Sequence, residues 1–526
     1  MLDVVVIGGG TNALVAATLL ARKRLSVVVL EQRPVVGGAA ITTEFAPGFQ
    51  APTLAHALGP FPADLAKALQ LEKTGLQLIT PDPSLSVVGR NGQAIVMQRD
   101  PVFTAEAINR LSSRDAARWR EFVDTIARVA SVISRVNRVD APSVNGVSKR
   151  EAWQLLSMGR RARALGRKDL ARLLRWMPMA VADVAAEWFE TDLLQAAIAA
   201  RAIFGNFAGP WSAGTGGMLL QRVAEDPMPL GSSVTAIGGP GAFSQALATV
   251  ARQAGVTIRT GACAARILAK NGRVTGVALD TGEEVSSRAV VSGIDPGRTL
   301  IDLVDPMDLD PTFRERARHI RARGVTAKIH LALSALPDFP AIAHDPLSLR
   351  GRVLIAPGID YLERAFDAAK YGAFSPAPWL DLTIPSVLDP GLAPARQHVM
   401  SIAVHAAPRH LRGTTWSEQR NPLYRAVMDT LAAHAPGLES LVVGSEIITP
   451  EDLETRWGFR GGHIFHGEPA LDQWWFARPL LGWADHRTPI ERLYLCSAGT
   501  HPGGGITGVS GQLAAMAVLK DRISSS

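Results

Sequence analysis

The glycines that follow the first apolar segment have the spacing of a dinucleotide-binding turn. Gly8, Gly10 and Ala13 form the pattern G-x-G-x-x-A directly after the apolar residues 4–7. Gly8 permits a tight turn, Gly10 lets the backbone approach a pyrophosphate, and Ala13 lets a helix pack closely on the strand. The free N–H groups at the start of that helix would bind the phosphates. The predicted contacts in this turn are Gly8, Gly10, Thr11, Asn12 and Ala13.

A carboxylate follows at the distance expected for a ribose contact. The second apolar segment, residues 26–30, ends in Glu31. This position is close to the offset of about 20 residues at which an acidic side chain binds ribose hydroxyls. An acid there also disfavours a 2′-phosphate. Because strand, glycine turn, helix, strand and acid occur in this order, they favour a dinucleotide site over an ordinary βαβ unit.

The composition indicates a packed globular protein of two or three domains or one interleaved body. Of 526 residues, 47% are hydrophobic and 20% are charged. Cys263 and Cys496 form no C-x-x-C pair, so neither a disulfide framework nor a redox pair is predicted. The net charge of +7 is modest for this length, and no zinc-ligand or RNA-binding spacing is present, so no metal and no nucleic acid is predicted. The sequence predicts no oligomeric state.

The chain enters an apolar segment within three residues of Met1, and no uninterrupted apolar run reaches 18 residues. These features favour a cytoplasmic protein that has neither a secretory signal nor a membrane-spanning helix.

Two segments at opposite ends of the chain resemble the amine oxidase and phytoene desaturase superfamily of flavin-dependent oxidoreductases. Near the amino end, Gly37 and Gly38 follow Glu31, as in the E…GG extension of that superfamily. Near the carboxyl end, an apolar strand at 493–496 enters a glycine-rich loop at 497–509 that precedes a small-residue helix. Residues 71–83 and 461–479 further resemble the phytoene desaturase-like branch.

The resemblance implies an α/β fold. We expect a Rossmann-type FAD-binding domain, of the glutathione reductase and amine oxidase kind, interleaved with a mixed α+β substrate domain that carries a helical insert. The FAD-binding domain would comprise residues 1–100, 225–300 and 485–526, the insert 101–224 and the substrate domain 301–484.

The resemblance also implies where FAD would be bound. In the family the segment that corresponds to Gly37 and Gly38 lies by the pyrophosphate and the flavin, and the carboxyl-terminal loop contacts the isoalloxazine ring. The helix after that loop would stabilise negative charge on reduced flavin. Cys496 is expected to be a buried, inert thiol, so FAD is expected to be noncovalent. The further FAD contacts implied are Gln32, Gly37, Gly38, Ala39, Ala264, Gly499, Gly504, Gly505, Ile506 and Val509.

A second glycine cluster, residues 237–242, also opens a predicted helix. Ser244 stands where the dinucleotide pattern requires its third small residue, and no acid closes the following strand. We interpret this cluster as structural packing. Beyond it, Asn271-Gly272 and Thr281-Gly282 predict a β-meander between residues 267 and 291.

Between residues 100 and 221 apolar positions recur at helical spacing, which predicts the insert. Its basic stretch, residues 160–175, has two open interpretations: an amphipathic helix on anionic lipid, or a solvated helix face. The first would make the protein peripheral to a membrane. Polar residues among aromatics in 461–479 could likewise line a pocket or form a polar network under a loop.

The function implied is FAD-dependent removal of a hydride equivalent from a hydrophobic substrate to flavin N5. The reaction would be carotenoid, polyene or cyclic-alkene desaturation, or the related isomerisation or saturation. His501 and His56, placed near the ring by resemblance, are candidates for proton transfer, or else orient groups by hydrogen bonding.

Two alternatives remain. An amine oxidase would use the same chemistry on a C–N bond, although the four tyrosines offer no clear aromatic cage. A non-enzymatic interaction protein, in the manner of the Rab GDP-dissociation inhibitors, would have lost the cofactor loops, whereas this chain retains Gly8, Gly10, Glu31, Gly37, Gly38 and Gly505.

Overall fold

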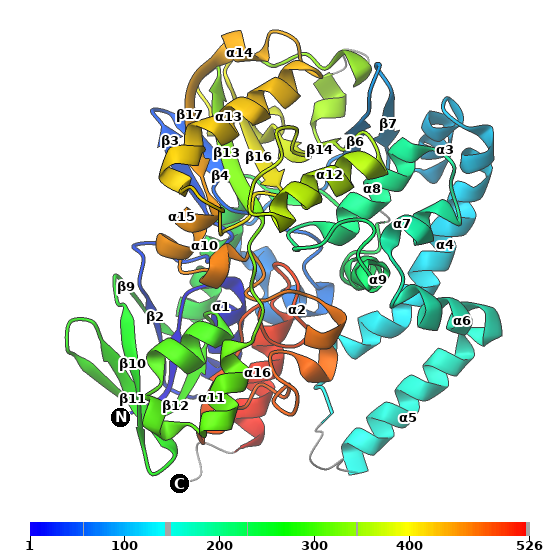
Figure 1. Ribbon diagram of the computed structural model, residues 1–526. Coiled ribbons are helices and arrows are strands. Elements are labelled where there is room, and N and C mark those ends of the chain that lie inside the picture. The colour runs from blue at the N-terminus through cyan, green and yellow to red at the C-terminus, as the bar shows by residue number, and fades with distance from the viewer. Residues whose placement is uncertain (56, 143–148, 229, 343–345, 522–526) are drawn as a thin grey trace.

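The computed structural model describes residues 1–55, 57–142, 149–228, 230–342 and 346–521. Two sheets lie at opposite ends of the molecule, and a group of helices lies beside them (Figure 1). The mixed α/β architecture that the sequence predicts is confirmed.

The first sheet contains five parallel strands in the order β18-β12-β1-β2-β9. Helices α1 (Thr11–Ala21) and α16 (Val509–Lys520) cover one face. Val4, Val5 and Val6 are fully buried, as expected for a parallel strand that is covered on both faces. The strands are β1 (Leu2–Ile7), β2 (Val27–Glu31), β9 (Thr257–Thr260), β12 (Glu284–Ser292) and β18 (Leu493–Leu495).

A β-meander extends the first sheet, as predicted. Strands β10 (Ala264–Lys270) and β11 (Arg273–Leu279) pair antiparallel with each other, and β11 pairs with β12. Asn271 and Gly272 both have positive φ, 53° and 73°, as a two-residue hairpin turn requires. The meander packs on the face of the sheet opposite α1.

The second sheet contains seven strands in the order β17-β13-β16-β15-β14-β6-β7. The first two of these strands along the chain are β6 (Leu85–Val88) and β7 (Ala94–Met97). The domain boundary predicted at residue 100 is therefore too late, because these two strands pair in the substrate domain. The other strands are β13 (Thr326–Leu333), β14 (Arg352–Ile355), β15 (Leu380–Thr383), β16 (His398–His405) and β17 (Val442–Ile448).

Helix α13 (Trp416–Ala432) covers the outer face of the second sheet, where Leu423, Val427 and Leu431 join the apolar core. The helix begins with a capping box in which Thr415 accepts from the Glu418 amide and Glu418 accepts from the Thr415 amide.

The predicted helical insert is present and forms the group beside the sheets in Figure 1. The amphipathic helix α4 buries Trp119, Phe122 and Ile126, and α8 is buried along most of its length. In the described part of the chain, no helix is both long and apolar enough to cross a bilayer. The insert comprises α3 (Pro101–Asn109), α4 (Ser113–Val136), α5 (Lys149–Ala164), α6 (Gly166–Trp176), α7 (Val181–Ala186), α8 (Asp192–Ile203) and α9 (Thr215–Glu225).

Shorter elements connect these layers. They are β3 (Thr42–Ala46), β4 (Phe49–Pro52), α2 (Ala63–Leu69), β5 (Leu78–Ile79), β8 (Thr235–Ala236), α10 (Gly239–Gln253), α11 (Pro311–Arg318), α12 (Ile359–Lys370), α14 (Leu438–Leu441) and α15 (Pro450–Thr455).

Candidate functional site

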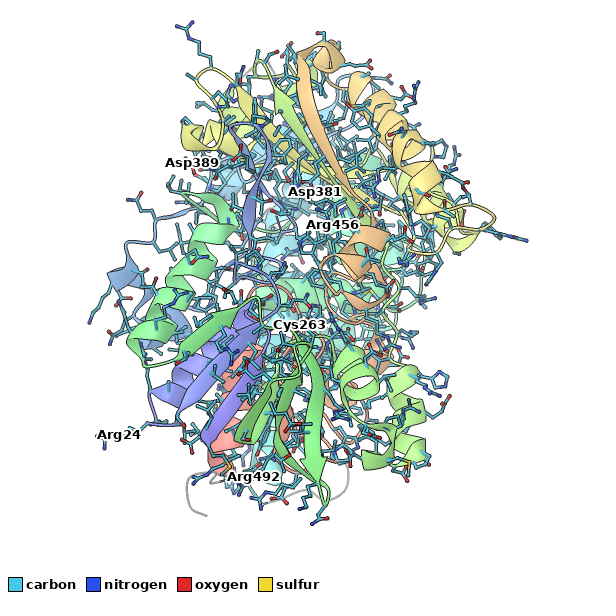
Figure 2. The ribbon with its side chains drawn as sticks, turned by 90° about the vertical axis from the view of Figure 1, so that its left-hand side faces the viewer. Arg24, Cys263, Asp381, Asp389, Arg456 and Arg492 are labelled. Atoms are coloured by element: carbon cyan, nitrogen blue, oxygen red, sulfur yellow. The ribbon has the colours of Figure 1, made fainter. Side chains whose placement is uncertain are left out.

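A cavity of about 380 Å³ lies between the two sheets and the insert. One end is lined by the turn after β1 and by the carboxyl-terminal loop, and we call it the nucleotide end. The other end is lined by β13, β14, β15, α8 and α9, and we call it the chamber. Figure 2 labels a residue near each end: Cys263, which follows β9, and Asp381 on β15.

The nucleotide end is shaped for close approach of a phosphate group. Helix α1 begins at the carboxyl end of β1, with Gly10 as its N-cap, no capping side chain and no acid in its first turn. Gly38 lies against it, since a Cβ at Gly38 would stand 3.1 Å from the Gly10 Cα. The N–H groups of the first turn are thus left for an anionic ligand.

Glu31 shapes the same end. Its carboxylate accepts from the Gly9 amide at 2.6 Å and from the Arg33 amide at 2.9 Å while it lines the cavity. Each carboxylate oxygen has two acceptor positions, so a ribose contact remains compatible with these bonds. The guanidinium of Arg33 donates to the Gly38 carbonyl, and its buried Nη1 has no partner among the described residues. Sequence reasoning missed this cation.

Most of the predicted contacts line the cavity together. They are Gly8, Gly10, Thr11, Asn12, Glu31, Gln32, Gly37, Gly38, Ala39, Ala264, Gly504, Gly505 and Ile506. Ala13, Gly499 and Val509 do not line it. Ala13 packs closely on Gly293, Gly499 packs on Pro296, and Val509 begins α16. These three residues position the lining instead. None of residues 237–242 lines the cavity, in agreement with the packing interpretation.

The carboxyl-terminal loop lies beside a carboxylate that sequence reasoning did not select. Glu225, at the end of α9, lines the cavity, and a Cβ at Gly504 would stand 2.4 Å from its Oε1. Glycine is therefore required at position 504. Gln221 donates to Glu225 at 3.0 Å, and burial raises the pKa of Glu225. A buried carboxylate with a raised pKa is suited to accepting a proton.

The two histidines predicted for proton transfer are His501 and His56. His501 is fully buried and does not line the cavity. Its Nε2 donates to the Val139 carbonyl at 3.0 Å, and burial lowers the pKa of His501 to about 3. The placement of His501 near the reacting centre is therefore wrong: its ring faces the insert. His56 lies outside the described residues.

The chamber has charged side chains inside otherwise apolar strands. Lys328 on β13 donates to the Ser401 hydroxyl at 2.7 Å, and burial lowers the pKa of Lys328 to about 7. Arg352 on β14 pairs with Asp381 on β15 at 2.6 Å, and burial raises the pKa of Asp381. A charge within a buried strand is the signal that could have identified these residues.

Apolar side chains complete the chamber. Among them, Trp379 stacks on His405, with ring centroids 3.7 Å apart, and Phe204 contacts the same imidazole edge-on. The apolar lining comprises Leu85, Ala197, Ala200, Phe204, Leu230, Leu354, Trp379, Ala403, Ile464 and Phe465. The chamber therefore suits a largely apolar molecule that also has a polar group.

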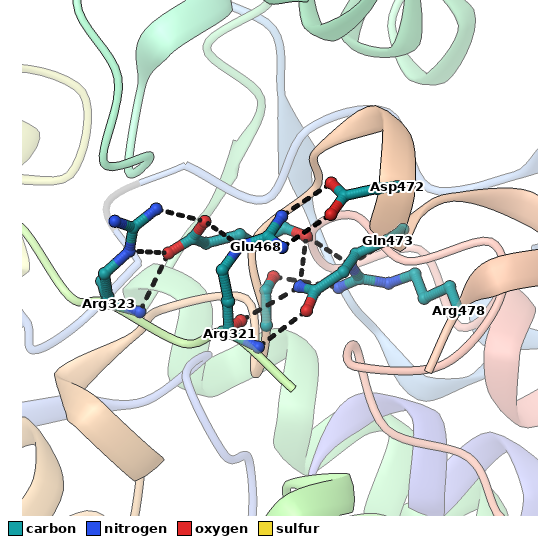
Figure 3. Close-up of polar contacts among 7 residues, drawn as sticks. Arg321, Arg323, Glu468, Asp472, Gln473 and Arg478 are labelled. Carbon is teal, nitrogen blue, oxygen red and sulfur yellow. Dashed lines mark hydrogen bonds and ion pairs between the residues drawn. The ribbon is translucent and has the colours of Figure 1, made fainter. Parts of the chain in front are cut away.

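The segment 461–479 satisfies both of its open interpretations. Ile464, Phe465 and His466 line the cavity. The residues after them form a polar network, in which Arg321 donates to the Asp472 carboxylate at 2.6 Å and Arg323 donates to the Glu468 carboxylate at 2.7 Å (Figure 3).

Arg478 fixes this segment to the carboxyl-terminal loop. It is fully buried and donates to backbone carbonyls on both segments, so the loop and the cavity wall are held as one unit. Its acceptors are the carbonyls of Phe465, Gly467, Glu468, Gln473 and Ala498.

Cys496 lies fully buried at the end of β18, as expected, and burial raises the pKa of its thiol to about 12. Such a thiol is not nucleophilic at neutral pH.

Together, the Rossmann-type sheet, the glycine cradle and the adjoining chamber define a flavin-dependent oxidoreductase. The chain belongs to the flavin containing amine oxidoreductase family, whose model matches residues 14–519.

Relatives span the whole chain. Pyridine nucleotide-disulfide oxidoreductase domain-containing protein 2 of Rattus norvegicus is 34% identical, over 99% of this chain and 93% of its own length. The phytoene desaturase (lycopene-forming) of Pantoea ananas is 25% identical over 98% of each chain. Among solved structures, cyclohexylamine oxidase from Brevibacterium oxydans has the same fold, with a TM-score of 0.58, 15% identity and 99% of each chain covered. The resemblance to the amine oxidase and phytoene desaturase superfamily is thus confirmed.

Proposed function

We propose that this protein binds FAD noncovalently and oxidises a largely apolar substrate, forming a carbon–carbon double bond. One observation carries the proposal: the cradle of backbone N–H groups and the apolar chamber are two ends of a single cavity. Similarity to a phytoene desaturase over nearly the full chain supports the desaturase type of reaction. Isomerisation and saturation would use the same cavity.

The residues of the nucleotide end would bind the pyrophosphate, a ribose and the adenine of FAD. The first turn of α1 would bind the pyrophosphate, Glu31 a ribose hydroxyl, and the backbone near Ala264 the adenine. When bound, FAD supplies the acceptor for the hydride equivalent that leaves one substrate carbon. Cys496 is too deeply buried and too weakly acidic to form a covalent tether.

Desaturation also releases a proton from the neighbouring carbon, and we propose Glu225 as its acceptor. Glu225 Oε1 lies against Gly504 in the loop that, in the family, meets the isoalloxazine ring. Its raised pKa brings the carboxylate closer to the working pH, where a general base is most effective. Glu225 thus takes the role that the sequence suggested for histidine.

The test is anaerobic mixing of purified holoprotein with polyenes, cyclic alkenes and amines while the flavin absorbance is followed. Bleaching by an alkene, with formation of a new double bond in the product, is the expected result. Bleaching by amines alone would support the amine oxidase alternative. A folded protein that remains colourless after FAD is added in excess would refute the flavin function altogether.

We further propose that the outer surface of the insert contacts an anionic membrane. Trp153 and Leu156 on α5 are 66% and 49% exposed, and Leu174 on α6 is 68% exposed. Arg160 follows Leu156 by four residues, which places both on one face of α5. In Figure 1, α5 extends away from the body. Exposed apolar groups beside basic ones are typical of helices that lie in a lipid interface.

A further inference from the structure

The charged groups of the chamber are not balanced. Four cationic side chains line it, and three carboxylates oppose them. Burial raises the pKa of Glu225 and Asp381 and lowers the pKa of Lys328, so it weakens charges of both signs. The cations are Lys328, Arg201, Arg222 and Arg352, and the carboxylates are Glu225, Asp226 and Asp381.

One carboxylate is shared between two of the cations. Asp381 pairs with Arg352 at 2.6 Å, and it also feels the charge of Lys328. Both members of the Arg352 pair are buried, at 14% and 2% side-chain exposure. Buried charges are costly unless each is compensated, and Asp381 compensates part of the charge on both Arg352 and Lys328.

Arg201 has no carboxylate partner of its own. Its guanidinium donates to the carbonyls of Arg222, Met228 and Asp226, and the carboxylates of Asp226 and Glu225 act on its charge from beyond ion-pair distance. Among the described residues it forms no ion pair, and its Nε makes no hydrogen bond. Arg201 is half-buried, and its cationic side chain lines the chamber.

Arg201 and Arg352 converge on one backbone position. A Cβ added at Gly231 would stand 3.0 Å from Arg352 Nη2 and 3.9 Å from Arg201 Nε. The next residue, Ser232, also lines the cavity, and its buried hydroxyl has no partner in the described chain. Two guanidinium groups and an unpaired hydroxyl thus meet at Gly231.

A second unpaired hydroxyl lies on β13. Thr326 is 3% exposed and lines the cavity, yet its Oγ1 bonds to no described residue. Thr326 and Lys328 are two residues apart on one strand and so share a face. Buried donors without partners are rare in folded proteins, and at a cavity wall they indicate a ligand that accepts hydrogen bonds.

We propose that the substrate carries a carboxylate, which the chamber binds with Arg201, Ser232 and Thr326. This inference rests on the proposed function, because it takes the chamber as the substrate pocket. A carboxylate supplies both the missing negative charge and the acceptors that these donors lack. The apolar body of the substrate would pack on Leu354 and Trp379. The same positive excess disfavours a protonated amine.

Matched probes test the proposal. We would titrate the flavin-loaded holoprotein with decanoate and with decan-1-ol, and follow the shift in flavin absorbance. We expect decanoate to bind at least tenfold more tightly. Equal affinities, or no carboxylate-dependent shift, would overturn the inference. Because the protein would still be yellow in that case, this failure differs from failure of the flavin function, in which no FAD is bound.

Variants then assign the preference to these residues. Arg201→Gln should remove the tenfold preference and leave the affinity for decan-1-ol within twofold. Arg252→Gln, on the exposed surface of α10, is the matched control and should change neither affinity. Ser232→Ala and Thr326→Val remove hydroxyls that bond to no described residue, so both variants should fold normally and weaken decanoate binding severalfold. If all three chamber variants kept the full preference, the assignment would be wrong.

Discussion

The two ends of the cavity are lined by different kinds of polar group. At the nucleotide end the contacts are largely backbone groups, exposed by glycines and concentrated in two short segments near the chain termini. In the chamber the polar contacts are side chains, and they come from α8, α9, β13, β14 and β15. The first end reflects local chain geometry, whereas the second requires separate elements to meet. The predictions below test this contrast.

The largest effect is expected at the nucleotide end. Gly38→Val places a side chain at φ 61°, where its Cβ would stand 3.1 Å from the Gly10 Cα. We expect flavin content, measured as the ratio of absorbance at the flavin and protein bands, to fall to background. Gly159→Ala, whose Cβ meets nothing within 4 Å, is the matched control and should keep its flavin. A yellow Gly38→Val protein would show that this cradle does not hold the cofactor.

A substitution at Glu225 should slow the reaction without changing flavin binding. Glu225→Gln keeps the size of the side chain and removes the proton acceptor. We expect the rate of flavin reduction by substrate to fall by about 10²–10⁴, the usual contribution of a general base. Flavin content should not change. Stopped-flow absorbance under anaerobic conditions measures the rate, and an unchanged rate would exclude Glu225 as the base.

The buried ion pair of the chamber should matter for folding. Arg352→Met removes the guanidinium that pairs with the buried carboxylate of Asp381, which should cost about 3–5 kcal/mol in the free energy of unfolding. The double variant Arg352→Met with Asp381→Leu should recover only part of this loss, because both members of the pair are then gone but Lys328 also loses the carboxylate beside it. Denaturant titration measures both. Equal losses in the single and double variants would contradict the pairing.

Lys328 should make stability depend on pH. Its pKa is lowered from 10.5 to about 7, so between these values the unfolded chain binds more protons than the folded protein. Stability contributed by the neutral amine therefore rises with pH in this window, by at most about 1.4 kcal/mol per pH unit. Between pH 7 and 9 we expect the free energy of unfolding of the wild type to rise relative to that of Lys328→Met. The unfolding free energies of both proteins at each pH provide the measurement.

The smallest effect concerns the outer surface of the insert, opposite the chamber. Replacing both Trp153 and Leu156 by Ala should weaken binding to vesicles that contain anionic phosphatidylglycerol by about tenfold, or ~1.4 kcal/mol of apolar contact. Tyr371→Ala, which is 71% exposed in wild type, is the control. Cosedimentation that is unaffected by the double variant would favour the solvated-face interpretation.

The contrast also explains which predicted residues the structure brings together. Gly8, Gly10, Glu31 and Gly38 were predicted as contacts, and all line the cavity, because a glycine turn and a strand-end acid act through local backbone geometry. The meander was predicted from Asn271-Gly272 for the same reason.

Elsewhere the prediction depended on distant contacts and failed. His501 follows the correct loop, yet its ring turns toward the Val139 carbonyl and away from the cavity. Strands β6 and β7 were assigned to the wrong domain, because strand pairing joins residues 85–88 to 352–355 across most of the chain.

The sequence by itself determined the glycine turns of the nucleotide end and the motifs that indicate the family, since each motif is formed by residues that are close along the chain. Only the tertiary structure decided which charges face the chamber. Arg201, Lys328, Arg352 and Asp381 lie on four different elements, and a lone charge in an apolar strand carries no record of its partners. Their meeting depends on sheet register and helix packing, which are set by the whole core rather than by neighbouring residues.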